Sequence, residues 1–523
     1  MKLPAVSNKK WFLSLLTVAL FSSVPGISFP AAAEPALCHG ILSTREASEA
    51  DQFALREALT EGQLQAKLAS SPNPLLDWIQ ATKSNVRPDQ VKPLSEELKR
   101  FLSAHKGERI LIFTDATSPD LVKGQGPRAW SNFRRTIRPQ TSGVITVMNV
   151  MRAEIAKYGV DVRFVTPEEF KFHYQIDYQD VVLAAPTQAE LDRIVGEQKN
   201  LAIHIMVEGS VGKAAKKYFQ KLGIPYSTAY HTDFPQYVMG AIQFYAQRFL
   251  GLKITQSLMN WLQVKERREA LAELVLNDLA KFHRHSEGVM VPTKAMLDDL
   301  VAKGFPVEDV RQWSHGVDLE KFVPVAEGPS ADWYTAKAIE LGVLPAGSKL
   351  KAPILLFVGR VGEEKNIEFF LDLPVEGTKV VVGDGPLLPA MKARYPSVVF
   401  MGRQPHSMVP EFMAHAHAFP FPSRSETFGL VNLEAAATGT PVVTFDYLKE
   451  IIADPSVGRT VPFTGNRQAD LQAFAAATNQ VLALNRAGVR AYAEDWSWEK
   501  SIVEMLTYFR FLTAEESNRL VIR

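Results

Sequence analysis

Short apolar runs recur along the second half of the chain and predict buried strands. Continuous apolar runs, rather than alternating ones, are typical of parallel strands that are covered on both faces. Each run leads into a loop that contains glycine, proline or charged residues. We therefore predict four strand–loop units of a parallel α/β half at Ile354–Val358, Lys379–Val382, Val398–Arg403 and Ala418–Ser423.

A second α/β half is predicted upstream. Strands are expected at Arg109–Asp115, Asp161–Thr166 and Asn200–Ile205, and helical stretches separate them, which favours parallel βαβ units. The turn Thr141–Val144 is expected to open the first of these helices. Ser118–Gln140 is longer than an ordinary loop, and predicts either a lid or acceptor loop or an ordered surface insertion.

The segment Ser423–Val443 carries the strongest chemical signal. Leu430–Thr438 predicts a helix that ends at Gly439, and Glu426 and Glu434 lie eight residues apart around its start. Free backbone N–H groups at a helix start attract phosphate. The two carboxylates are separated by about two turns, so they are expected to reach different parts of one ligand, a sugar and a ribose.

This spacing resembles the E-x7-E signature of retaining glycosyltransferases of the GT-B architecture, in which two Rossmann-like domains face a cleft. An amphipathic helix with two solvated acids is the alternative for an isolated pair. The resemblance covers roughly Arg109–Phe509. It points to glycosyltransferase family four, also called glycosyl transferases group one, and within it to mannosyl- and sulfoquinovosyl-type lipid glycosyltransferases.

The loop after Ile354–Val358 contains Gly359, Arg360 and Lys365. The resemblance assigns Arg360 and Lys365 to the donor diphosphate, and fixed cations do stabilise a departing diphosphate. The alternative is a solvated loop. The chain has no Asp-x-Asp pair, so we expect no metal and no other cofactor.

The resemblance also implies further site residues. His231, in a Tyr-His-Thr loop, is expected near the transferred sugar, although a lone histidine after a strand can instead satisfy backbone groups. The catalytic set is then His231, Arg360, Lys365 and Glu426. The donor-binding set adds Gly143, Gly359, Gly383, Arg403, Thr427, Phe428, Gly429, Leu430 and Glu434. The family reaction retains anomeric configuration, and the leaving phosphate helps deprotonate the acceptor hydroxyl.

Six segments are expected along the chain. They are a signal peptide or membrane anchor (1–33), a helical extension (34–105), an N-terminal Rossmann-like acceptor domain (106–323), a linker (324–351), a C-terminal Rossmann-like donor-nucleotide domain (352–490) and a C-terminal helix that crosses back to the N-terminal domain (491–523). The segments 289–293 and 310–318 resemble the last strands before the linker.

Composition changes this picture little. The chain has 523 residues, of which 46% are hydrophobic, so it can bury two cores, and a formal net charge of +1 gives no indication of nucleic-acid binding. Its single cysteine, Cys38, excludes an intramolecular disulfide. The partners expected are a nucleotide-sugar donor and an acceptor of unknown identity, with a membrane lipid as one candidate.

The N-terminus predicts a location. Lysines precede the apolar run Trp11–Val24, and Ala31–Ala33 follow it, as in a secretory signal peptide, whereas Trp11–Ala33 taken whole could serve as an uncleaved anchor. We expect a membrane-associated protein whose catalytic domains face the cytosolic donor pool. An exported soluble form is the alternative.

Two other functions stay open. An exported sugar- or glycan-binding protein without turnover could use this fold, and the signal-like N-terminus favours it. A nucleotide-sugar epimerase would convert its substrate with no acceptor present.

Overall fold

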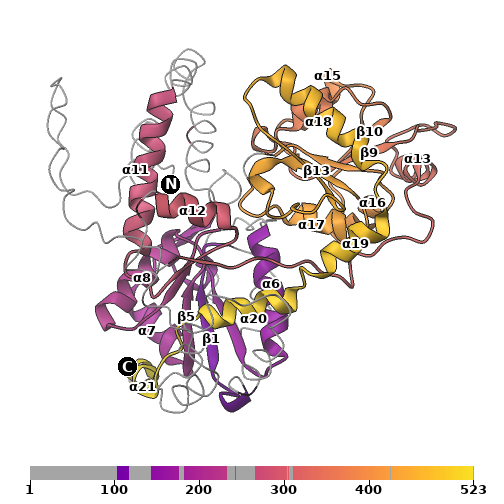
Figure 1. The fold of residues 1–523 in the computed structure, drawn as a ribbon. Coiled ribbons are helices and arrows are strands. Elements are labelled where there is room, and N and C mark those ends of the chain that lie inside the picture. The colour runs from indigo at the N-terminus through magenta and orange to yellow at the C-terminus, as the bar shows by residue number, and fades with distance from the viewer. Residues whose placement is uncertain are drawn as a thin grey trace, which may run out of the picture. The chain divides into compact units, whose positions relative to one another are not determined.

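The computed structural model describes residues 100, 103–116, 143–175, 182–231, 242, 265–302, 304, 310–423 and 426–521 (Figure 1). The contacts discussed below lie within one compact unit, residues 99–236 and 277–523. The predicted segment 1–33, nearly all of the extension 34–105, and the insertion Ser118–Gln140 lie outside the described residues. Among the helices that are described, none is long and apolar enough to cross a membrane.

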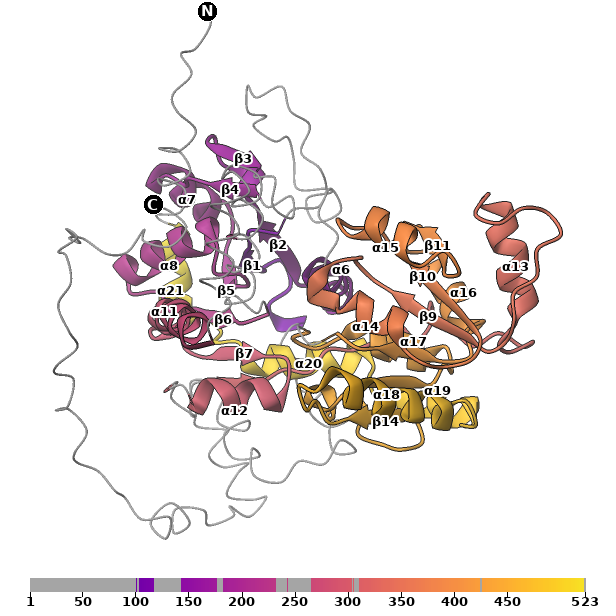
Figure 2. The same ribbon diagram turned by 90° about the horizontal axis from the view of Figure 1, so that it is seen from above.

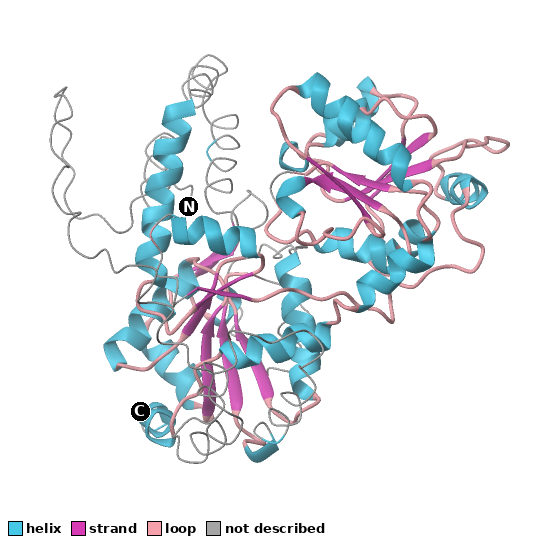
Figure 3. Cartoon of the chain, viewed as in Figure 1, coloured by secondary structure: helices cyan, strands magenta, loops and turns pink. Residues whose placement is uncertain are grey.

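The first half of this unit is built on a parallel sheet of six strands in the order β2-β1-β5-β6-β7-β8. Its strands are β1 (Arg109–Phe113), β2 (Asp161–Val165), β5 (Asn200–Ile205), β6 (Ser227–Ala229), β7 (Val289–Val291) and β8 (Val310–Gln312). Its helices, cyan in Figure 3, are α6 (Gly143–Ala156), α7 (Gln188–Gly196), α8 (Ser210–Leu222) and α12 (Lys294–Ala302), together with the end of α11 (Lys265–His283), of which residues 277–283 belong to this unit. The three strands predicted upstream are confirmed.

Burial explains the apolar runs of this sheet. Every residue of β1 and of β5 is buried, as is expected for central parallel strands with helices on both faces. Phe113 of β1 packs edge-on against Phe219 of α8 at 5.5 Å between ring centroids. A short antiparallel hairpin, β3 (His173–Gln175) and β4 (Val182–Ala184), and the 3-10 turn η3 (Pro167–Glu169) lie outside this sheet.

The second half has two three-stranded parallel ladders that continue one another. The ladders β11-β10-β9 and β12-β13-β14 meet where Leu355 pairs with Ala418, and the amide of Leu356 donates to the Ala418 carbonyl at 3.1 Å. The strands are β9 (Ile354–Val358), β10 (Thr378–Val382), β11 (Val399–Gly402), β12 (Phe419–Phe421), β13 (Val442–Phe445) and β14 (Gly458–Val461). The four predicted strands are confirmed, and β13 and β14 complete the set.

The helices of the second half follow its strands in βα order (Figure 2). They are η5 (Glu363–Lys365), α14 (Ile367–Asp372), α15 (Leu388–Arg394), α16 (Val409–Ala414), α17 (Leu430–Ala437), η6 (Asp446–Leu448), α18 (Arg467–Val481) and α19 (Arg486–Glu494). The predicted linker contains α13 (Ala331–Glu340), whose N-cap is the Ser330 side chain. The helix predicted at Leu430–Thr438 is confirmed, and Thr438 is its C-cap.

Glycine permits two loops to touch at the carboxyl ends of β9 and β10. A Cβ on Gly383 would lie 1.8 Å from the carbonyl oxygen of Gly359, which no side chain can tolerate. The Gly359 amide donates to the Val382 carbonyl at 3.0 Å, and the Val361 amide donates to Asp384 at 2.9 Å. The predicted close backbone approach is therefore present, and it brings the loop that carries Arg360 and Lys365 against the neighbouring strand end.

The C-terminal segment returns to the first half. The helix α20 (Trp498–Tyr508) packs beside α6, as Figure 1 shows. Phe511 then pairs antiparallel with Ala202 of β5. This residue precedes His204 and Ile205, the two residues of β5 that pair with β6. The prediction of one final helix is wrong in this respect, because α21 (Ala514–Val521) follows and packs against α7. The polar helix is fixed by tertiary contact, for instance Ser517 Oγ to the Asn200 carbonyl at 3.1 Å.

The segment that leads from the first half into the linker lies beside the segment that leads back to the first half at the start of α20. The Val317 amide donates to the Trp496 carbonyl at 2.8 Å, and the indole Nε1 of Trp313 donates to the Ser501 carbonyl at 3.0 Å. A Cβ on Gly316 would lie 2.5 Å from the Trp498 amide nitrogen, so only glycine allows this approach. The segment 313–317 is thereby held to the start of α20.

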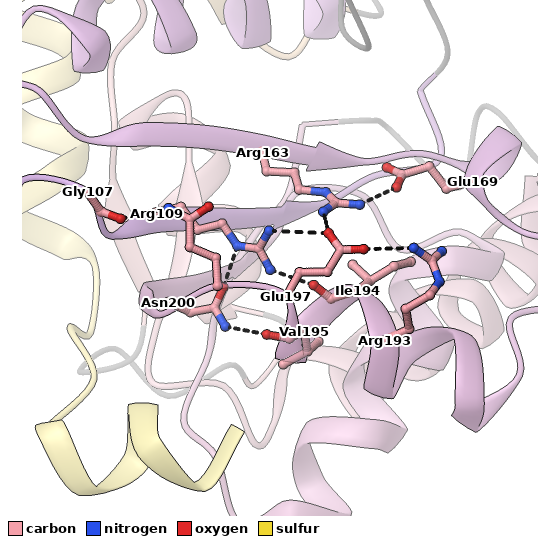
Figure 4. A network of polar contacts seen from close by, with 10 residues as sticks. Gly107, Arg109, Arg163, Glu169, Arg193, Ile194, Val195, Glu197 and Asn200 are labelled. Atoms are coloured by element: carbon pink, nitrogen blue, oxygen red, sulfur yellow. Dashed lines mark hydrogen bonds and ion pairs between the residues drawn. The ribbon is translucent and has the colours of Figure 1, made fainter. Parts of the chain in front are cut away.

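A network of charged and polar side chains lies at the amino-terminal ends of the strands of the first sheet (Figure 4). Arg109, at the start of β1, donates to the Asn200 side chain at 2.9 Å, and Glu197 accepts from Arg163 and from Arg193. Burial lowers the pKa of Arg109 to about 10. The network lies at the amino-terminal ends of the strands, away from the loops of the predicted site, and we assign it a structural role.

The Gly359–Gly383 contact gives a stability prediction. Gly383→Ala is expected to lower the free energy of unfolding by roughly 1–3 kcal/mol, because its methyl group would overlap backbone. Gly488→Ala is the matched control: a Cβ there meets nothing within 4 Å in helix α19, so stability should be unchanged or slightly raised. Urea unfolding midpoints compare the two, and equal midpoints would contradict the close approach.

Candidate active site

The carboxylate of Glu426 is the centre of a polar contact set between two strand ends. Lys365, in η5 after β9, places Nζ 2.5 Å from Oε1 of Glu426, and the Ser423 hydroxyl donates to the same oxygen at 2.7 Å. The Glu426 side chain is 14% exposed and that of Lys365 is 24% exposed. Residues 61 positions apart thus form one partly buried ion pair.

Neighbouring side chains fix both loops of this pair. The Asn366 amide donates to the Pro422 carbonyl at 3.1 Å, and the Tyr447 hydroxyl donates to the Ser423 carbonyl at 2.5 Å. Asn366 adopts the left-handed conformation, with φ of 53°, immediately after Lys365. The loop after β9 is therefore tied to the loop after β12 by the side-chain amide of Asn366 as well as by charge.

The helix α17 begins directly beside Glu426. Its N-cap is Gly429, with φ of 77°, and a Cβ there would lie 2.7 Å from the Asn432 side-chain nitrogen. The buried Phe428 packs beneath this turn. A helix start presents backbone N–H groups and a positive dipole end, which together favour an anion.

Glu434 projects from the interior of the same helix into different surroundings. Its side chain is 14% exposed, and Oε1 lies 4.0 Å from Nε2 of His406. Burial raises the pKa of Glu434 to about 7, with Lys321 opposing this rise and Asp318 adding to it. The two acids therefore have unequal environments: one is paired with a lysine, and the other is desolvated.

Sequence reasoning missed the partners of Glu434. Lys321 Nζ contacts Nδ1 of His406, and burial lowers the pKa of Lys321. The Asp318 carboxylate accepts from the amide of Lys321 at 3.0 Å, which places Lys321 one turn after the Gly-Val-Asp sequence. The sequence signal that could have identified Lys321 is its position three residues after Asp318, the last residue of the Gly-Val-Asp turn. His406 had none, because it lies in a loop with no distinctive pattern.

The two predicted diphosphate cations differ in their contacts. Lys365 is paired with Glu426, whereas Arg360 Nε lies 3.4 Å from Glu364 and the Arg360 side chain is 40% exposed. Arg403 is exposed in the bend after β11. Gly143, the first residue of α6, is brought against the donor-half motif, because a Cβ there would lie 3.6 Å from the Leu430 side chain. Thr427 is half-buried between Glu426 and Phe428.

His231 is buried after β6 within a cluster of rings. Its centroid lies 5.2 Å from Trp313 and 5.2 Å from His315. Within the described part of the chain, neither ring nitrogen of His231 has a hydrogen-bond partner. Burial lowers the pKa of His231 to about 3, so the imidazole is neutral at physiological pH. No described backbone group is satisfied by this histidine, contrary to the alternative stated for it.

Comparison with known proteins matches both halves. The family model for glycosyltransferase family 4 matches residues 169–321, and that for glycosyl transferases group 1 matches residues 352–483. The chain therefore carries the two domains of a glycosyltransferase, and the predicted family is confirmed. The linker segment that contains α13 falls between the two matched ranges.

Individual relatives agree with this assignment. The chain is 27% identical to the sulfoquinovosyl transferase SQD2 of Arabidopsis thaliana, over 72% of this chain and 68% of that protein. It is 29% identical to the alpha-monoglucosyldiacylglycerol synthase of Streptococcus pneumoniae, over 62% of this chain and 73% of that protein. The structure of a sucrose-phosphate synthase from Thermosynechococcus elongatus aligns with a TM-score of 0.50 at 18% identity, over 76% of this chain and 97% of that one. The predicted GT-B fold is confirmed.

The raised pKa of Glu434 predicts a pH-dependent stability. In the unfolded chain this group titrates near 4.5, so its ionisation in the fold becomes costly as pH rises from 4.5 through about 7. Each pKa unit corresponds to about 1.4 kcal/mol, so the cost reaches roughly 3 kcal/mol above pH 7. Glu434→Gln should therefore be more stable than wild type at pH 8.

At pH 5 the difference should shrink to roughly 1 kcal/mol or less, because Glu434 is then protonated in the fold and only the unfolded chain is ionised. Melting temperatures at both pH values measure the difference. His406, Lys321 and Asp318 face this carboxyl group in both proteins, so the measured difference includes their electrostatic response to the loss of its charge. A difference that does not change with pH would show that Glu434 is ionised throughout.

Proposed function

We propose that this glycosyltransferase moves a hexose from a nucleoside-diphosphate sugar to an acceptor hydroxyl with retention of anomeric configuration. The observation that carries the proposal is the Lys365–Glu426 pair at the start of α17. It combines a cation, a carboxylate and a helix N-terminus within one loop cluster. The cation and the helix N-terminus suit a diphosphate, and the carboxylate accepts hydrogen bonds from sugar hydroxyls.

The departing nucleoside diphosphate is where negative charge develops during transfer. Lys365 and Arg360 supply positive charge beside the start of α17, and fixed charges in a desolvated site stabilise such a leaving group without reorganising. In the structure Lys365 is partly neutralised by Glu426. Binding of the diphosphate would add a second partner to this lysine, and it would leave Glu426 able to accept from the sugar.

Glu434 supports the nucleoside end of the ligand. It lies a little over one turn into α17, away from the Lys365 pair, and a carboxylate can accept hydrogen bonds from both hydroxyls of a ribose. In this scheme no protein nucleophile is used. The leaving phosphate takes the proton of the acceptor hydroxyl on the face from which it departs.

The acceptor is proposed to be a membrane lipid. The two relatives described above are named for sulfoquinovosyl transfer and for a glucosyldiacylglycerol. Activity without a metal is part of the same proposal, since protein cations and the helix start are assigned to the diphosphate.

A donor panel tests the function. Purified full-length protein is incubated with UDP- and GDP-linked glucose, galactose and mannose, with and without diacylglycerol vesicles, and the products are resolved by mass spectrometry. Release of nucleoside diphosphate with a glycosylated lipid of unchanged anomeric configuration is expected. Conversion of one nucleotide sugar into another without acceptor would instead indicate the epimerase, and binding without turnover would indicate the binding protein.

The diphosphate contacts give the next prediction. Arg360→Ala and Lys365→Ala should each lower turnover by roughly 10²–10³, the scale for loss of one fixed charge-stabilising group. The wild-type enzyme should keep its activity in EDTA. Initial rates of donor consumption provide the measurement. Full activity of both variants, or complete loss of wild-type activity in EDTA, would refute the assignment.

The unequal environments of the two acids predict different losses. Glu434→Ala should weaken binding of the bare nucleoside diphosphate, whereas Glu426→Ala should reduce sugar transfer and leave that affinity nearly intact. Calorimetric titration of each variant with UDP or GDP, beside a transfer assay, separates the two effects. If both variants lost nucleotide affinity equally, the division of roles would be wrong.

The proposed location is the membrane surface, with the catalytic domains facing the nucleotide-sugar pool. Cell fractionation should recover full-length protein with membranes, and its C-terminus should resist external protease on intact cells. A soluble exported form that starts near Glu34 would contradict the anchor and favour the binding protein.

A further inference from the structure

His315 lies in the interior, in contact with several aromatic rings. Its ring centroid is 5.2 Å from that of His231 and 4.9 Å from that of Phe428 in the Thr-Phe-Gly turn. Trp313 lies 4.9 Å away and Trp498 stacks at 6.1 Å. The side chain is therefore enclosed by rings from both halves of the unit, and it is 5% exposed.

The position of this ring is set by the backbone on either side of it. Trp313 is fixed by the hydrogen bond from its indole to Ser501, and Ser314 is fixed because its carbonyl accepts from the Ser501 hydroxyl at 2.6 Å. Gly316 follows in close contact with Trp498. The backbone on both sides of His315 is thus held in place, and the ring packs among other aromatic rings.

Ring nitrogens of His231 and His315 are buried polar atoms. Nδ1 of His315 and both nitrogens of His231 are buried without a hydrogen-bond partner among the residues that the structure describes. A buried polar atom that stays unpaired costs stability, and most such atoms in native proteins are paired. A phenylalanine would avoid this cost at position 315. Two adjacent imidazoles with three unpaired nitrogens therefore indicate polar contacts that a ligand completes.

The charge state indicates the kind of ligand. Burial lowers the pKa of both histidines, so both rings are neutral near pH 7. A neutral imidazole has one N–H donor and one acceptor nitrogen. Such a pair suits hydroxyl groups, which both donate and accept, better than it suits an anion, which needs a cation.

We propose that His315 and His231 form a two-imidazole subsite that hydrogen-bonds the hydroxyl groups of the transferred hexose. The inference rests on the proposed function, and it adds His315 as a sugar-contacting residue. Phe428 joins the subsite to the donor motif, because it lies two residues after Glu426 and packs on the His315 ring. The sugar is thus contacted by Glu426 from the second half and by His231 and His315 from the first half.

The test measures how much the sugar contributes to binding. The affinities of UDP and UDP-glucose, and of GDP and GDP-mannose, are compared by calorimetry for each protein, and the ratio within a pair is the sugar contribution. His315→Phe keeps the ring packing and removes the nitrogens. It should reduce the sugar contribution roughly three- to ten-fold, the range for one neutral hydrogen bond, and lower kcat, while the affinity for the bare nucleotide is unchanged.

Two further variants sharpen the result. His315→Phe combined with His231→Phe should lose less than the product of the two single losses, since groups that bind one ligand are not additive. His415→Phe is the matched control, because His415 is also buried and stacks on a tryptophan, Trp333, at 4.4 Å, away from the motif. It should leave the sugar contribution unchanged.

A merely structural His315 predicts the opposite pattern. The phenylalanine variant would then keep its sugar contribution and its kcat, and this result would overturn the proposal. If the phenylalanine variant lost bare-nucleotide affinity as well, His315→Gln would decide, because its amide keeps a donor and an acceptor. Normal nucleotide affinity in that variant with complete loss of the sugar contribution would also overturn it. A wild-type protein that binds no donor would instead refute the proposed function itself.

Discussion

The ion pair between Lys365 and Glu426 is the contact on which the candidate site depends. It joins the loop after β9 to the loop that precedes α17, and both partners are mostly removed from water. Partly buried charges are tolerated only when they are paired and hydrogen-bonded, and here the Ser423 hydroxyl completes the arrangement. Each half of the pair therefore fixes the position of the other, so that the cation and the carboxylate are in place before any ligand binds.

Burial distributes charge unevenly around this pair. Glu426 keeps a cationic partner, whereas Glu434 on the same helix loses hydration and has a pKa of about 7. The imidazoles of His231 and His315 are neutral for the same reason. One region thus offers positive charge for a diphosphate and another offers uncharged hydrogen-bonding groups for hydroxyls. A nucleotide sugar presents these two chemistries along its length.

The parallel crossings at 313–317 and 496–501 place His315 beside the motif. Gly316 permits the backbones to touch, and the Trp313 indole is held by Ser501. These contacts explain why residues far from the acidic motif bear on its surroundings. They also show that the C-terminal segment does more than cover the first sheet, since α20 supplies Trp498 to the cage around His315.

Much of the fold follows from local sequence. The apolar runs determined the strands β1, β5 and β9–β12, because parallel strands covered on both faces are apolar at successive positions. Gly429 and Gly439 similarly determined the limits of α17, since a helix end needs special backbone angles. The spacing of Glu426 and Glu434, together with the strand–loop units that precede it, identified the family and with it the GT-B fold. The short hairpin β3–β4 and the polar helix α21 had no comparable signal, because tertiary contacts stabilise them.

Side-chain partnerships across the fold were decided only by the tertiary structure. Lys365 and Glu426 are 61 residues apart, and Arg109 meets Asn200 and Glu197 through strand pairing. The sequence contained His231 and His315, yet nothing in it placed one ring 5.2 Å from the other. Periodicity reports which face of an element is buried. Which residues meet there depends on strand order, register and the path of the C-terminal helix, and no local pattern encodes these.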